Sequence, residues 1–152
     1  MILFVMMLVI SLEHSVSSDD GLHYDCSILD RAIYPFIHAN VFHMIINGWC
    51  MLSIVFTFSP SWKRMLTAYL IAISYPAAFI GRETVVGLSG VCFALMGLNA
   101  YKVKRKKIFY TWTSACIALG FLFPNVAAGV HVFCFLVGLA CDFLGRKLNV
   151  LS

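Results

Sequence analysis

Long apolar stretches with few charged residues recur along the whole chain and constrain its fold more than any other feature. Hydrophobic residues make up 61% of the 152 residues and charged ones 12%, against roughly 45–50% and 25% in a soluble domain. A soluble domain of this size cannot bury so much apolar surface. Six stretches approach the length of a membrane-spanning helix, and the sequence therefore predicts an all-α membrane protein with six such helices: about 1–16, 36–58, 65–80, 86–101, 108–123 and 126–144.

Nothing in the sequence divides the chain, because it contains no internal repeat and no low-complexity tract. We expect one domain over residues 1–152. The apolar excess excludes a disordered chain and a disulfide-stapled secreted protein. Five of the six cysteines lie in apolar stretches without metal-binding spacing, which predicts packing residues. The first stretch has the length of a signal peptide but lacks a positively charged leading region, and we expect it to remain as a helix.

The basic residues gather on one side of the predicted bundle. Arg31 and Arg82 fall on the other side, where six of the seven acidic residues also lie or border. Basic residues mark the cytoplasmic side of membrane proteins, which predicts that both termini are cytoplasmic. The run 102–107 is interpreted as a topology anchor, ahead of an anionic-lipid or nucleic-acid site. The nine residues of the basic side are Lys63, Arg64, Lys102, Lys104, Arg105, Lys106, Lys107, Arg146 and Lys147.

Three polar residues stand in the first half of the second apolar stretch, where polar groups are costly and usually face the interior of a bundle. At about 100° per residue, His43 and Asn47 lie about 40° apart, one turn along the same face. His38 lies some 7 Å nearer the outer end, at about 1.5 Å per residue. Each residue alone fits a packing role, but the group of three favours a site. The group has no acidic ligand and no i, i+4 histidine pair, so we expect no metal.

A serine between two glycines opens the fourth stretch, in the sequence Gly87-Leu-Ser89-Gly90, and His131 opens the sixth. Each is weak evidence alone, since small residues are common at contacts between membrane helices. Together they fit a nucleophile and the base that removes its proton. Asp142 lies 11 residues beyond His131, or about 16 Å along a helix. The arrangement therefore predicts a Ser-His dyad without a triad acid.

With these residues in view, the chain resembles the rhomboid intramembrane serine proteases over essentially its whole length. The resemblance rests on the pattern HxxxxHxxxN from His38 to Asn47, on the GLSG sequence that contains Ser89, and on His131 in the last helix. It implies that Ser89 is the nucleophile and His131 the general base. His43 and Asn47 would line the oxyanion site with the backbone N–H of Ser89, and His38 would support them.

The resemblance also implies packing roles around this site. Phe93 occupies the position of a tyrosine that, in many members, stacks on the catalytic histidine, and Gly138 fits a small position where the last helix meets the fourth. Gly87 and Gly90 would allow close approach to the serine. The family usually has a small residue three positions after the histidine, where this chain has Cys134, so we expect slightly wider helix spacing.

The implied function is an intramembrane serine endopeptidase that hydrolyses peptide bonds in or near the transmembrane segments of membrane-protein substrates. Its partners would be those substrates and membrane lipid, with no metal, no cofactor and no nucleic acid. It would be a multi-pass protein of the bacterial inner (plasma) membrane, of open oligomeric state. The alternatives are a non-catalytic rhomboid-like chaperone or pseudoprotease, and a metal or proton transporter that uses His38, His43 and His131.

Overall fold

The computed structural model describes residues 21–80, 84–123 and 126–147. The predicted first helix, residues 1–16, and the loop residues Arg82 and Glu83 lie outside these ranges, as do both chain ends, so the cytoplasmic placement of the termini stays a prediction. The described residues contain helices and no strand, which confirms the all-α prediction. The α-helices are α2 Ile28–Ile33, α3 Val41–Phe58, α4 Trp62–Ile73, α5 Ser89–Asn99, α6 Lys106–Gly120 and α7 Ala128–Lys147, with 3-10 turns η1 Tyr34–Phe36, η2 Ala77–Phe79 and η3 Ala100–Lys102.

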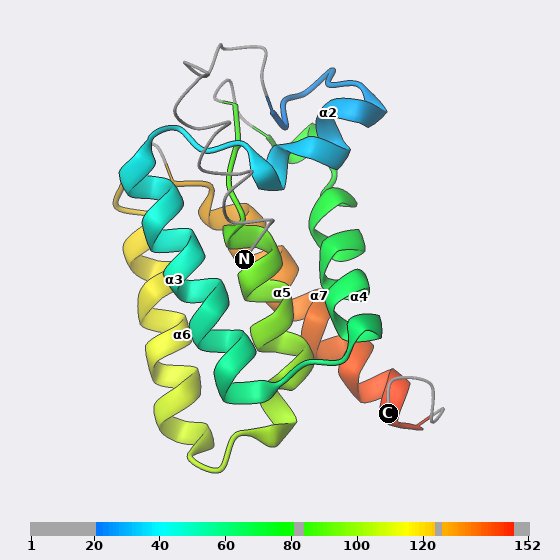
Figure 1. The fold of residues 1–152 in the computed structure, drawn as a ribbon, viewed down its shortest axis with the longest axis vertical. Helices are drawn as coiled ribbons and strands as arrows, with labels where there is room; N and C mark the ends of the chain where they lie inside the picture. The colour runs from blue at the N-terminus through cyan, green and yellow to red at the C-terminus, as the bar shows by residue number, and fades with distance from the viewer. Residues whose placement is uncertain (1–20, 81–83, 124–125, 148–152) are drawn as a thin grey trace.

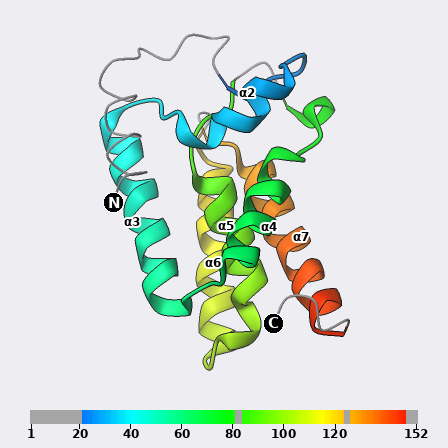
Figure 2. The same ribbon diagram turned by 45° about the vertical axis from the view of Figure 1, so that its right-hand side comes forward.

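Helix α5 is the central element of the described structure. It packs chiefly against α7 and also contacts α4 and α3, while α6 packs against α7 (Figures 1 and 2). Most of its residues are buried, on every side of the helix. The predicted fourth stretch, about 86–101, is short for a full span and was expected to start inside protein, below the membrane surface. It corresponds to α5, an 11-residue helix enclosed by its neighbours.

Local backbone chemistry sets where the helices begin and end. The Asn40 side chain caps α3 by accepting a hydrogen bond from the His43 backbone N–H at 2.8 Å. The same helix ends at Ser59, which takes a left-handed conformation with φ 43°. Helix α4 ends at Ile73, shortly before Pro76, because proline disfavours helical geometry in the residue that precedes it. The predicted range 65–80 therefore holds a helix only in its first part.

Two of the described helices, α3 and α7, are long and apolar enough to cross a membrane by length and composition. Helices α4, α5 and α6 have 12, 11 and 15 residues. The predicted second span, 36–58, is helical from Val41, because the 3-10 turn η1 and an extended Ile37 precede it. The predicted fifth and sixth ranges, 108–123 and 126–144, correspond to α6 and α7.

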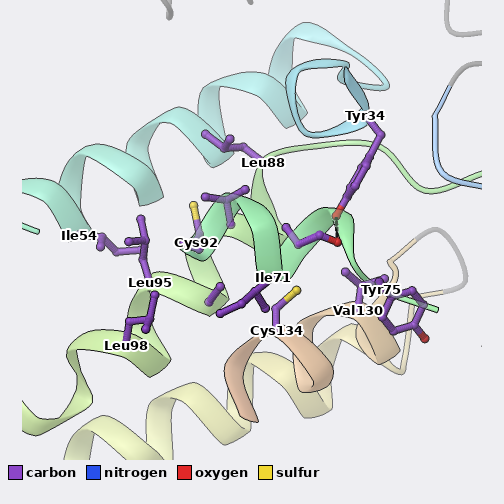
Figure 3. Packing of buried hydrophobic residues seen from close by; sticks show 14 of the residues in the cluster. Tyr34, Ile54, Ile71, Tyr75, Leu88, Cys92, Leu95, Leu98, Val130 and Cys134 are labelled. Carbon is purple, nitrogen blue, oxygen red and sulfur yellow. Dashed lines mark hydrogen bonds between the residues drawn. The ribbon is translucent and has the colours of Figure 1, made fainter. Parts of the chain in front are cut away.

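Apolar side chains fill the centre of the bundle and also cover its outside. In the core, Cys92 and Leu95 of α5 pack with Ile54 of α3, Ile71 of α4 and Cys134 of α7 (Figure 3). Both cysteines are buried and free, as predicted for packing residues. On the outside, large apolar side chains are exposed in numbers that a water-soluble surface rarely carries, which fits contact with lipid. They include Trp49, Phe56, Trp62, Trp112 and Phe143.

Candidate active site

Ser89 and His131 lie in direct contact at the end of the bundle where α5 and α7 begin. Ser89 is the first residue of α5, and His131 stands in the first turn of α7. The Ser89 Oγ and the His131 Nε2 are 2.9 Å apart, which is hydrogen-bond distance. His131 is buried, and Ser89 is partly buried. The structure thus brings together two residues that are 42 positions apart, in the geometry that a nucleophile and its base require.

The backbone before Ser89 takes a conformation that only glycine adopts readily. Gly87 has φ +110°, and its N–H donates to the Tyr34 carbonyl at 3.0 Å. A Cβ on Gly87 would lie 2.8 Å from the His43 Cε1 and 3.0 Å from its Nε2. The His43 imidazole therefore lies against the backbone that leads into Ser89, and the missing side chain of Gly87 is what allows the contact.

Asn47 completes this group from the next turn of α3. Its side chain is buried, and its Nδ2 donates to the His43 carbonyl at 3.0 Å. The same Nδ2 lies 3.5 Å from the position that a Gly87 Cβ would take. An amide nitrogen carries two hydrogens, so one donor remains after the bond to His43. His43 and Asn47 face the same backbone segment, as their spacing predicted.

His38 stands behind His43 rather than beside Ser89. The two imidazoles meet edge to face, with centroids 5.4 Å apart and planes at 70°. The His38 Nδ1 lies 3.2 Å from the Phe36 carbonyl, which fits an Nδ1–H donor, and the ring is buried. Its Nε2 has no hydrogen-bond partner among the described residues. His38 thus packs against His43, and its supporting role in the site stays a prediction.

The surroundings of His131 keep its ring in place and bring α7 close to α5. Phe93, one turn after Ser89, stacks on the imidazole with centroids 4.5 Å apart and planes at 23°. A Cβ on Gly90 would lie 3.5 Å from the Cys134 Sγ and 3.3 Å from both Val130 and the Tyr34 hydroxyl. The Cys134 contact would be an ordinary one, and the tight contacts would be those with Val130 and Tyr34. The 2.9 Å contact between Ser89 and His131 forms with Cys134 in place.

Helices α5 and α7 make their closest approach at two glycines. A Cβ on Gly97 would lie 2.4 Å from the Phe135 carbonyl oxygen, and one on Gly138 would lie 2.5 Å from the Ala94 carbonyl oxygen. Real Cβ atoms do not approach backbone this closely. Both positions therefore require glycine at the present helix separation. The sequence analysis expected a small-residue contact at Gly138 but did not single out Gly97.

Sequence reasoning missed two residues that shape the end of the bundle near Ser89. Tyr34 is buried, donates its hydroxyl hydrogen to the Ala72 carbonyl at 2.9 Å and accepts the Gly87 N–H at its own carbonyl (Figure 3). Arg31 donates to the Tyr75 carbonyl at 2.9 Å and so joins α2 to the end of α4. These residues lie in the long polar loop before α3, where the sequence carries no periodic signal.

At the opposite end of the bundle, Asp142 lies 11 residues beyond His131 on α7, and so it is far from the dyad, as the spacing predicted. It is buried and paired with Arg64 at 2.9 Å and with Arg146 at 3.0 Å. The sequence analysis had assigned Arg64 to a cytoplasmic loop, but it is a buried residue of α4. The available signal was that Asp142 is the one acidic residue on the basic side of the predicted bundle.

Comparison with known proteins places the chain in a family. The family model of the Rhomboid domain matches residues 27–148, which is most of the chain and includes Ser89 and His131. No curated protein and no solved structure matches the chain. The rhomboid family consists of membrane proteins and contains both intramembrane serine proteases and pseudoproteases. With a family match over this length, the chain belongs to the rhomboid family.

Proposed function

We propose that the chain is an active intramembrane serine endopeptidase that cuts peptide bonds in or near transmembrane segments of membrane-protein substrates. The observation that carries the proposal is the 2.9 Å contact between the Ser89 Oγ and the His131 Nε2. A serine hydroxyl is a weak nucleophile unless a base takes its proton, and a neutral imidazole at this distance is such a base. A relative that lacks the serine or the histidine could not form this pair, and this chain has both residues.

In the proposed reaction, the Ser89 Oγ attacks the substrate carbonyl carbon while the His131 Nε2 accepts the hydroxyl proton. The tetrahedral intermediate collapses to an acyl-enzyme as His131 gives this proton to the leaving amine. Water then attacks the ester with His131 again as base, and the Ser89 Oγ leaves as the hydroxyl. No acidic residue takes part as a third member of the site. The stacked Phe93 ring holds the imidazole instead.

The oxyanion would be held by donors from two helices. Ser89 begins α5, and the first-turn N–H groups of a helix have no acceptor within it. The remaining amide hydrogen of Asn47 and the imidazole of His43 come from α3, beside Gly87. Such donors stabilise the charge that develops during attack. The enclosed position of α5 keeps them away from lipid.

The substrate class follows from the membrane setting. A transmembrane helix has its carbonyls hydrogen-bonded internally, so the scissile segment must unwind before Ser89 can reach it. We infer that substrates carry small or helix-weakening residues near the cut. We also infer a multi-pass protein of six spans in the bacterial inner membrane, with both termini cytoplasmic and Ser89 near the outer side. The proposed reaction uses no metal, cofactor or nucleic acid.

A fluorophosphonate probe tests the proposal against its alternative, a non-catalytic rhomboid-like chaperone or pseudoprotease. Such probes react with a serine only when its hydroxyl is activated. We expect the detergent-solubilised protein to be labelled, and the Ser89→Ala and His131→Ala variants to be unlabelled. A matched control is Ser53→Ala, because Ser53 lies on α3 and donates to the Trp49 carbonyl. Absence of labelling in the wild-type protein would favour the pseudoprotease.

A further inference from the structure

A charged side chain is buried at the end of the bundle opposite to Ser89. Arg64 of α4 is 3% exposed, and its partner Asp142 of α7 is 2% exposed. A buried charge is strongly unfavourable unless it is paired and hydrogen-bonded. The pair is therefore expected to have a defined geometry, in contrast to a surface ion pair.

The Arg64 guanidinium contacts both helices of the dyad with one nitrogen. Its Nη1 donates to the Asp142 Oδ1 on α7 at 2.9 Å and to the Leu98 carbonyl of α5. Within the described residues, no other side-chain hydrogen bond or ion pair brings a third helix into contact with both α5 and α7. One nitrogen of Arg64 thus joins α5 to α7 at this end of the bundle.

The position of this contact along the two helices matters. Leu98 follows Gly97, and Asp142 lies one turn after Gly138, so the Arg64 contact lies just beyond the closest approach of α5 and α7. Ser89 and His131 lie on the other side of that approach, about 10–12 Å away along their helices at 1.5 Å per residue. On the dyad side of this approach the two helices also meet, where Phe93 stacks on His131 and Gly90 faces Cys134. A further contact beyond the crossing fixes the angle between them.

We propose that Arg64 is a positioning residue for the Ser89–His131 pair: by joining Leu98 to Asp142 it fixes the angle between α5 and α7. This inference rests on the proposed protease function. Arg64 touches neither the substrate nor the reacting atoms. Its effect reaches Ser89 and His131 through two helices of 11 and 20 residues, each of which is continuous from the Arg64 contact to the dyad.

Arg146 provides a natural comparison, because it binds the same carboxylate but lies on the same helix as Asp142. It therefore does not join α7 to α5. Its Nε donates to the Asp142 Oδ2 at 3.0 Å, from a position four residues along the same helix. Its side chain is half exposed. Both guanidinium groups lie over the Tyr101 ring, Arg64 at 5.1 Å and Arg146 at 4.9 Å from its centroid. An exposed cation–π contact is weak compared with a buried bond, so Arg146 is expected to matter little for the helix angle.

The test separates positioning from stability by replacing the whole buried pair. In the double variant Arg64→Met/Asp142→Leu, apolar side chains of similar size fill the space, and such replacements usually keep or raise stability. We expect the thermal midpoint to stay at or above that of the wild type. We expect the rate of Ser89 labelling by the fluorophosphonate probe to fall roughly 10- to 100-fold, as small misplacements of reacting groups typically do.

Further variants keep the test decisive if the double variant does not fold. Arg64→Lys retains the buried charge but replaces the planar fork with a single ammonium group, so we expect slower labelling at a nearly unchanged thermal midpoint. The matched controls are Arg146→Met, which removes the other partner of Asp142, and Lys63→Met, an exposed neighbour on α4. Both controls should label within about twofold of the wild type, since neither side chain bridges α5 and α7.

Each outcome has a separate meaning. Labelling at the wild-type rate in the folded double variant, or in Arg64→Lys, would overturn the positioning role. Labelling that falls only in proportion to the loss of folded protein would also overturn it, because Arg64 would then be purely structural. Failure of the wild-type protein itself to label would overturn the proposed protease function, which the inference requires.

Discussion

Phe93 lies flat against the imidazole of His131, with ring centroids 4.5 Å apart and planes at 23°. Phe93 stands one turn after Ser89 on α5, so the helix that supplies the nucleophile also supplies the surface on which the base rests. The stack limits rotation of the imidazole away from the Ser89 hydroxyl. No hydroxyl group on the aromatic ring is needed for this contact.

Replacing Phe93 therefore tests how much the stack contributes. We expect Phe93→Leu to slow Ser89 labelling roughly two- to tenfold, which corresponds to an aromatic contact of about 0.5–1.5 kcal/mol. Phe93→Tyr keeps the ring and should retain the wild-type rate within about twofold. The control is Phe133→Leu, because Phe133 packs against Tyr75 with centroids 5.2 Å apart. An undiminished rate in Phe93→Leu would show that the stack does not hold the base.

The close approach of α5 and α7 predicts a steric effect at its glycines. In Gly97→Ala the new methyl group would meet the Phe135 carbonyl at 2.4 Å, so the helices must separate. We expect a loss of about 1–3 kcal/mol in the free energy of unfolding, as for other overpacked sites, together with slower labelling. Thermal denaturation in micelles measures the first effect.

Gly129→Ala is the matched control for this substitution. Gly129 is exposed near the start of α7, and its Cβ would meet only the Tyr75 hydroxyl, at 3.0 Å. We expect a thermal midpoint equal to or above that of the wild type, because alanine favours a helix over glycine. Equal midpoints for Gly97→Ala and the wild type would contradict the close approach.

The amide of Asn47 offers a test of the oxyanion donors. Its Nδ2 donates one hydrogen to the His43 carbonyl and keeps the other available. We expect Asn47→Ala to lower kcat by up to about 10²-fold without abolishing turnover, since other donors overlap with it. The effect should appear in kcat rather than KM, because the charge exists only in the transition state. A change confined to KM would assign Asn47 to substrate binding instead.

The loop before α3 carries a pH-sensitive helix cap. The Ser27 Oγ and the Ser27 backbone N–H donate to the Asp30 Oδ2 at 2.7 and 2.9 Å, and these bonds hold the pKa of Asp30 below its ordinary value. With a lowered folded-state pKa, the cap stabilises α2 above the unfolded carboxyl's pKa. This contribution is lost as the pH falls through the lowered value.

A carbon NMR titration of Asp30 in micelles measures this cap. We expect the pKa of Asp30 to rise toward its ordinary value in Ser27→Ala, because both the hydroxyl donor and the capped geometry are lost. Ser53→Ala should leave the titration unchanged. Identical titrations of Asp30 in the wild type and in Ser27→Ala would show that the cap does not form in solution.

Much of the candidate site could be predicted from residue spacing and from short motifs in the sequence. The interval between His43 and Asn47 places both on one helical face, and the structure directs both toward Gly87. The pairing of Ser89 with His131 was predicted from the chemistry of serine and histidine and from the family resemblance. The helix ends were harder to predict, because the apolar residues after Ile73 have the composition of a helix although α4 stops before Pro76 and only the 3-10 turn η2 follows.

The residues that join the helices away from the dyad could not be predicted from the sequence alone. A basic residue at the edge of an apolar stretch is usually exposed, and nothing local to Arg64 indicates burial. Its partner Asp142 lies 78 positions away. The same holds for Gly97, whose need for glycine arises from the backbone of α7. Such contacts depend on the angle between helices, which periodicity does not encode.

The proposal that Ser89 and His131 form a proteolytic dyad is tested most directly by cleavage of a transmembrane reporter. The purified protein would be reconstituted into liposomes with a single-span reporter, and the products would be mapped by mass spectrometry. We predict cleavage in or near the reporter's transmembrane segment by the wild type and by Ser53→Ala. We predict none by Ser89→Ala or His131→Ala. Cleavage by either of these two variants at the wild-type rate would contradict the dyad.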